Sequence, residues 1–138
     1  MNTTVKAFIP ILLSLIILSA CNTYSYEYKF SGENDHWEAE IFFKGTEDQY
    51  SRGDANYDFT VTYKGLSQEL ASTDEITYSF ETESENFSAT KKFSNPPTDV
   101  SFTSKGNSSG TVSADEQITV NVKWNGIEES FELENISK

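Results

Sequence analysis

The sequence predicts an all-β fold, an antiparallel β-sandwich of immunoglobulin-like type, behind a hydrophobic signal-peptide helix. After Cys21, apolar and polar residues alternate through most of the chain, which is the pattern of half-buried strands. The same part shows no long window with a 3.6-residue period. Turn residues separate the alternating runs at intervals of about ten residues, a spacing typical of sandwiches. A small closed barrel is the alternative.

The first twenty residues have the pattern of a secretory signal peptide. Residues 1–6 are polar with one positive charge, and residues 7–18 form the apolar run AFIPILLSLIIL. This run is too short to cross a hydrocarbon core as a helix, which takes roughly 20 residues. Its length and flanks fit a signal peptide better than a buried helix of the mature domain, because Pro10 interrupts a helix and a polar segment follows.

The apolar run ends in Leu18, which together with Ser19, Ala20 and Cys21 resembles the lipobox of bacterial lipoproteins. The resemblance implies that the Cys21 sulfur takes a diacylglyceryl group and that cleavage occurs between Ala20 and Cys21. Two acyl chains anchor a protein stably without spanning the bilayer. Cys21 is also the only cysteine, which excludes an internal disulfide framework and a Cys-rich zinc site.

The expected organisation is therefore a signal peptide over residues 1–20, a lipidated N-terminus and short tether over 21–25, and one β domain over 26–138. We expect the first strand to start near Tyr26. Phe42 breaks the alternation of its run and predicts a bulge or a second covered face. Leu66 and Leu70 allow one helical turn at most. The predicted strands lie within residues 24–30, 37–43, 57–63 and 76–80, with weaker runs at 87–93 and 100–103.

The C-terminal hairpin is the most specific element. Asn125 and Gly126 are a preferred pair for a type I′ turn, in which both central residues need positive φ. A two-residue turn here fixes the register of the two strands. It pairs Trp124 with Ile127, Val120 with Phe131, Ile118 with Leu133 and Lys123 with Glu128. The pair of Val122 and Glu129 is the one mismatch, and we expect water to reach it near the tip.

The lipobox, the strand that starts at Trp37 and the C-terminal run ITVNVKWNGIEESFEL are together similar to small uncharacterised lipoproteins of Bacillus-type Gram-positive bacteria. This resemblance implies a domain on the extracytoplasmic face of the cell membrane, held by membrane lipid through acylated Cys21. It assigns no functional residue besides Cys21.

Candidate sites for chemistry are few. His36 is the only histidine and lies in an acidic turn, which indicates a surface position. Asp54, Asn56 and Asp58 have the spacing that opens a calcium loop, but Phe59 and Gly65 occupy positions that such a loop gives to Gly and Glu. Paired carboxylates at Glu81, Glu83 and Glu85 are a further candidate, although a solvated strand face is the favoured interpretation. Exposed aromatic residues, Tyr50 beside Arg52 and Phe42, are candidates for sugar or peptide binding.

The net charge of the chain limits the classes of partner that it can bind. From Cys21 onward the chain has nine basic and 22 acidic residues and so a net charge of −13. This disfavours nucleic acid, because neutralising phosphates needs Lys and Arg. We expect a monomeric, non-catalytic binding module without a cofactor, whose partner is an unknown protein or envelope component. The alternative is a cell-envelope hydrolase that uses the paired carboxylates.

Overall fold

The computed structural model describes residues 22–137, and the expected signal peptide, Ala20 and Cys21 lie outside them. The described chain folds into eight strands and one short 3-10 turn. These are β1 (Thr23–Glu33), β2 (Trp37–Asp48), β3 (Ala55–Tyr63), η1 (Ser67–Leu70), β4 (Glu75–Glu81), β5 (Asn86–Lys92), β6 (Ser101–Ser108), β7 (Ile118–Trp124) and β8 (Ile127–Asn135).

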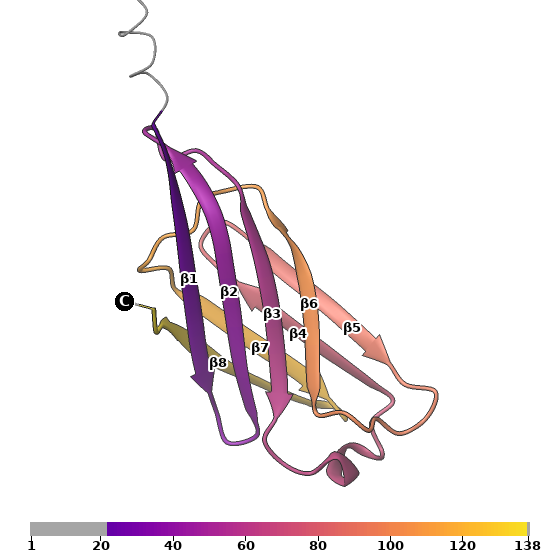
Figure 1. Ribbon diagram of the computed structural model, residues 1–138. Coiled ribbons are helices and arrows are strands. Elements are labelled where there is room, and N and C mark those ends of the chain that lie inside the picture. Colours follow the sequence, from indigo (N-terminus) through magenta and orange to yellow (C-terminus); the bar gives the residue numbers. More distant parts are fainter. Residues whose placement is uncertain (1–21, 138) are drawn as a thin grey trace, which may run out of the picture.

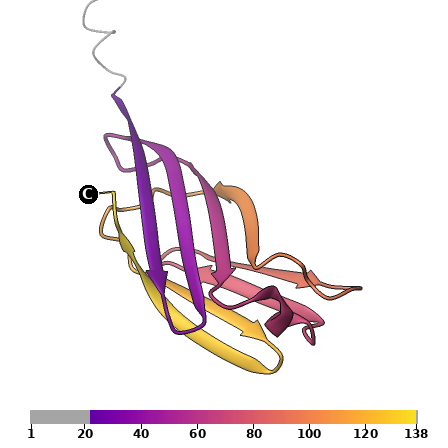
Figure 2. The ribbon, with the colours of Figure 1, turned by 60° about the horizontal axis from the view of Figure 1, so that its bottom comes forward.

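All eight strands belong to one antiparallel sheet in the order β5-β4-β7-β8-β1-β2-β3-β6. The sheet is folded so that β1, β2, β3 and β6 face β8, β7, β4 and β5 (Figures 1 and 2). The sheet is nearly closed, and β5 and β6 lie at the two ends of its order. The all-β prediction is confirmed. The immunoglobulin-like strand order is not confirmed. Here β1, β2 and β3 are consecutive neighbours in the sheet, whereas immunoglobulin-like domains place their third strand in the opposite sheet.

The core lies between the two facing halves and is rich in aromatic rings. Eleven of its 22 buried apolar side chains are aromatic, so ring packing decides how the halves fit. The ring of Phe80 meets those of Phe43, Tyr57 and Phe59 edge-on, with centroids 5.1 to 6.3 Å apart. Edge-to-face contacts of this kind add about 0.5–1.5 kcal/mol each to the free energy that burial supplies.

The C-terminal hairpin has the predicted register. Asn125 and Gly126 have φ of 49° and 73°, and β7 pairs with β8 from Trp124 opposite Ile127 to Ile118 opposite Leu133. One detail was wrong: Val122 is fully buried. It lies on the core-facing side of β7 between Val120 and Trp124, so water does not reach it.

Several strands are longer than their alternation predicts. β1 begins at Thr23, and β2 and β6 continue through Gly45 and Gly106, which the sequence places in turns. A tyrosine stands directly opposite each of these glycines, Tyr26 opposite Gly45 and Tyr57 opposite Gly106. Each ring lies where the side chain of the opposite residue would be. The ring therefore covers the glycine and lets the strand continue.

Phe42 does not cause the expected bulge. The pairing of β2 with β1 and β3 runs without interruption past this residue, with Lys29 opposite it on one side and Asp58 on the other. Its side chain lies on the outer face of the sheet and is 38% exposed, so the expected second covered face is also absent at this residue. Phe42 is an ordinary exposed aromatic residue in a regular strand.

Candidate functional site

The connections between the strands gather at two ends of the molecule. The N-terminal end carries residue 22 and the connections 49–54, 82–85 and 109–117; the far end carries 34–36, 64–74, 93–100 and 125–126 (Figure 1). Polar side chains at the far end come together from segments that are distant in the sequence. This end holds a hydrogen-bonded polar cluster that joins two of these connections to β8.

Glu129 links β8 to the turn between β1 and β2. Its Oε1 lies 2.7 Å from His36 Nδ1, and its Oε2 accepts a hydrogen bond of 2.9 Å from Asn34 Nδ2. The side-chain oxygen of Asn34 accepts hydrogen bonds from the backbone N–H groups of His36 and Trp37, which fixes the turn. Asn34 therefore positions His36, and Glu129 holds both. We call these three residues the Asn34–His36–Glu129 cluster.

A second pair lies close by. The Tyr63 hydroxyl donates a hydrogen bond of 2.8 Å to Glu69 Oε2, and the backbone N–H of Leu66 donates to Glu69 Oε1. The hydrogen bond to Glu69 raises the pKa of Tyr63. The same bond, the Leu66 N–H and the nearby His36 lower the pKa of Glu69. The carboxylate is therefore held ionised and orders the loop between β3 and β4.

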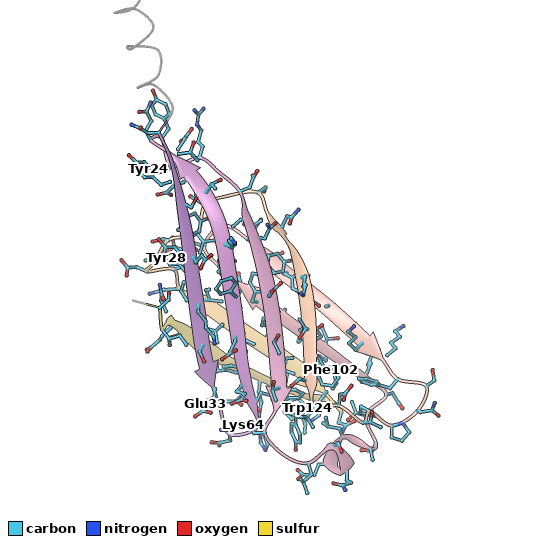
Figure 3. All side chains as sticks on the ribbon, in the orientation of Figure 1. Tyr24, Tyr28, Glu33, Lys64, Phe102 and Trp124 are labelled. Carbon is cyan, nitrogen blue, oxygen red and sulfur yellow. The ribbon has the colours of Figure 1, made fainter. Side chains whose placement is uncertain are left out.

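Aromatic rings form the floor beneath the Asn34–His36–Glu129 cluster. The ring of Trp124 lies 5.9 Å from that of His36, and Trp37 packs against both Trp124 and Tyr63. Trp37 is fully buried, and its Nε1 has no hydrogen-bond partner among residues 22–137. Lys64 lies at the rim, where its Nζ donates to the backbone oxygen of Asn34 and pairs with Glu33 at 3.2 Å (Figure 3).

The Asn34–His36–Glu129 cluster can bind a polar group through the imidazole of His36. His36 is half exposed, and Glu129 occupies only its Nδ1, so Nε2 is left for solvent or a ligand. In the chain that the structure describes, no hydroxyl or thiol is hydrogen-bonded to His36. Exposed Leu66 and Ile127 add apolar surface to the far end. The far end therefore presents a half-exposed imidazole over an aromatic floor, together with exposed apolar side chains.

The three residues with calcium-like spacing do not converge. Asp54 and Asn56 line a shallow open hollow of about 530 Å³ together with Lys44. Asp58 lies farther along β3, 4.0 Å from Lys105. Within residues 22–137, no group of three or more His, Cys, Asp and Glu side chains is placed to hold a metal ion.

The three glutamates of the carboxylate hypothesis are arranged differently from the prediction. Only Glu81 belongs to a strand, at the end of β4, while Glu83 and Glu85 lie in the turn to β5. The backbone N–H of Thr82 donates to the oxygen of Glu85 at 2.7 Å and closes this turn. Glu85 Oε1 accepts a hydrogen bond from the Ser109 backbone N–H. The trio therefore does not stand in a row along an extended chain.

The sequence alone does not place Asn34, His36 and Glu129 in one cluster. His36 is at the surface, as predicted, but its partner Glu129 is 93 residues away. The one signal in the sequence was the mismatch of Val122 and Glu129 within the hairpin. A carboxylate on the apolar side of a strand requires polar partners from another element, and here Asn34 and His36 supply them.

Comparison of the chain with known protein families, with curated proteins and with solved structures finds no match. Among residues 22–137, no helix is long and apolar enough to cross a membrane.

Proposed function

We propose that this chain is an exported lipoprotein, held on the extracytoplasmic face of the cell membrane by lipid on Cys21. Its β domain is a monomeric, non-catalytic binding module for a protein or another envelope component, and it needs no cofactor. The apolar run and the lipobox-like Leu18, Ser19, Ala20 and Cys21 support the anchoring. The two facing halves of the sheet support a sandwich-like scaffold.

The orientation of the domain relative to the membrane is the observation that carries the proposed binding function. β1 begins at Thr23, so only Asn22 separates it from Cys21, and an extended chain spans at most about 7 Å over these two residue steps. The N-terminal end must then lie at the lipid surface. β2, with 12 residues, runs between the two ends and is roughly 40 Å long. The Asn34–His36–Glu129 cluster and exposed Leu66 and Ile127 consequently face away from the membrane, where a partner can reach them.

Two measurements in cells test this proposal. A palmitate analogue fed to the cells should label the wild type and not Cys21→Ser, because the analogue enters through the Cys21 sulfur. A photo-crosslinking residue at position 66, on the far end, should capture a defined partner. The same residue at position 42, on the outer face of β2, is the matched control. An unlabelled wild type contradicts the anchoring, and equal capture at the two positions contradicts binding at the far end.

A further inference from the structure

The corner of the N-terminal end where the described chain begins exposes two aromatic rings and a guanidinium group. Tyr24 is 56% exposed and Tyr50 is 68% exposed, and Arg52 is also exposed. The register pairs Thr23 with Asp48, so the loop 49–52 extends beyond the first residue of β1. Figure 3 shows Tyr24 where the described chain begins, at the opposite end from Lys64 and Trp124. We call Tyr24, Tyr50 and Arg52 the proximal corner.

The loop that carries Tyr50 and Arg52 is held in one shape by Asp48. Its Oδ1 accepts hydrogen bonds of 2.8 and 3.0 Å from the backbone N–H groups of Tyr50 and Arg52. Its Oδ2 pairs with the Arg52 guanidinium at 2.9 and 3.0 Å. These bonds lower the pKa of Asp48. The guanidinium lies 5.0 Å from the centre of the Tyr50 ring, a cation–π distance, so the ring is fixed while it stays in solvent.

We infer that the proximal corner binds the headgroup region of the membrane, so that the domain is held by surface contact as well as by lipid on Cys21. This inference rests on the proposed lipidation. A tether of about 7 Å is comparable to the headgroup layer, which adds roughly 5–8 Å on each side of the hydrocarbon core. A rigid tyrosine beside such a tether must lie in that layer. Tyrosine is enriched at the membrane–water interface, because its ring is apolar and its hydroxyl is polar.

The distribution of charge determines which part of the N-terminal end can contact the membrane and which kind of lipid it can bind. The N-terminal end is acidic elsewhere, with Glu81, Glu83 and Glu85 in and beside one turn and Asp54 in another connection. Anionic headgroups repel such groups. At the proximal corner Arg52 neutralises Asp48, while Glu47, opposite Tyr24, adds a carboxylate beside the tyrosine rings. The corner should therefore bind a surface of zwitterionic lipid and bind less well as anionic lipid is added.

A depth measurement on the full, lipidated chain tests the inference. Gln49→Cys places an environment-sensitive dye in the loop, because a Cys21 sulfur that carries lipid does not react with the dye reagent. In phosphatidylcholine vesicles with spin-labelled headgroups, we expect dye emission at position 49 to be quenched. The same dye at Leu66→Cys, on the far end, should not be quenched. Adding phosphatidylglycerol to the vesicles should reduce the quenching at position 49.

Substitutions distinguish membrane contact through the proximal corner from anchoring by lipid on Cys21. In Tyr24→Ala/Tyr50→Ala the quenching at position 49 should become weaker while the chain stays on the vesicles, because the short tether alone still keeps this loop near the headgroups. Unchanged quenching in the double variant contradicts a contact through the tyrosine rings. Phe42→Ala, which removes an exposed ring away from the corner, should change neither the quenching nor the vesicle binding. An unchanged thermal unfolding midpoint shows that the variants fold. Equal quenching at positions 49 and 66, in a chain whose mass shows diacylglyceryl on Cys21, overturns the inference and leaves the anchoring intact. A mass without that lipid overturns both.

Discussion

Glu129 shows how one residue can decide the structure of a whole end of the molecule. It stands between Ile127 and Phe131 on the side of β8 that faces the core, opposite fully buried Val122. An unpaired carboxylate in that position would cost several kcal/mol. Glu129 avoids this cost because it lies at the end of the sheet, keeps 24% of its side chain exposed, and has partners for both oxygens in His36 and Asn34.

Replacing Glu129 should therefore destabilise the domain. We expect Glu129→Ala to lower the free energy of unfolding by about 1–2 kcal/mol, because it removes two hydrogen bonds of a charged group. Urea denaturation measures the change. Glu132→Ala, at an exposed position of the same strand, is the matched control and should stay within about 0.5 kcal/mol of the wild type.

The double variant His36→Ala/Glu129→Ala tests whether the two residues act together. The loss should be smaller than the sum of the two single losses, because either substitution alone already breaks the contact. Additive losses would contradict the link between β8 and the turn that follows β1.

At the scale of elements, the junction of β1 and β8 joins the two halves of the sheet. It consists of Phe30 opposite Asn135 and Ser31 opposite Glu134. Two further hydrogen bonds extend it, from the backbone N–H of Ile136 to the oxygen of Lys29 at 2.8 Å and from the backbone N–H of Lys29 to the Ser137 hydroxyl at 3.2 Å. Gly32 follows Ser31 immediately. A Cβ at this position would collide with the backbone oxygen of Glu132 and lie 2.9 Å from the side chain of Leu133. Only glycine lets the two strands cross this closely.

Gly32→Ala should therefore weaken the junction. We expect a loss of about 1–3 kcal/mol of unfolding free energy, the usual cost of forcing an extra methyl group into a packed site. Gly110→Ala is the matched control, because a Cβ at position 110 meets no atom within 4 Å. Thermal or urea unfolding compares the two variants, and equal stability of both would show that the strands can separate at the junction without cost.

At the scale of the whole molecule, the tyrosines couple stability to alkaline pH. Burial raises the pKa of Tyr26 and of Tyr57, and the hydrogen bond to Glu69 raises that of Tyr63. The unfolded chain therefore loses these protons at lower pH than the folded chain. The stabilisation is complete below the unfolded pKa of about 10 and is lost as the pH rises through the folded values.

The free energy of unfolding should thus be nearly constant from about pH 7 to pH 9 and fall above about pH 10. Denaturant titrations at a series of pH values measure this fall. Tyr63→Phe should make it shallower, because the variant lacks one of the three groups. Phe42→Leu, which changes an exposed ring that does not titrate, should leave the steepness of this fall unchanged. A flat profile through pH 11 would contradict the assigned burial and hydrogen bonding of the tyrosines.

The alternation of apolar and polar residues located the central part of every strand, because this pattern depends only on residues that are close in the sequence. The ends were less predictable. Gly45 and Gly106 read as turn residues, and only the tyrosines opposite them explain why β2 and β6 continue. The supposed bulge at Phe42 failed for a similar reason: the regular pairing of β2 with both neighbours accommodates an exposed ring.

By itself the sequence determined the all-β class, the turn at Asn125 and Gly126 and the register of the last hairpin, since each depends on local backbone geometry. Only the tertiary structure decided that β1 lies beside β8, and that Glu129 reaches His36 and Asn34 across 93 and 95 residues of chain. Contacts this distant depend on how the whole sheet folds over its aromatic core. No local pattern of residues encodes them.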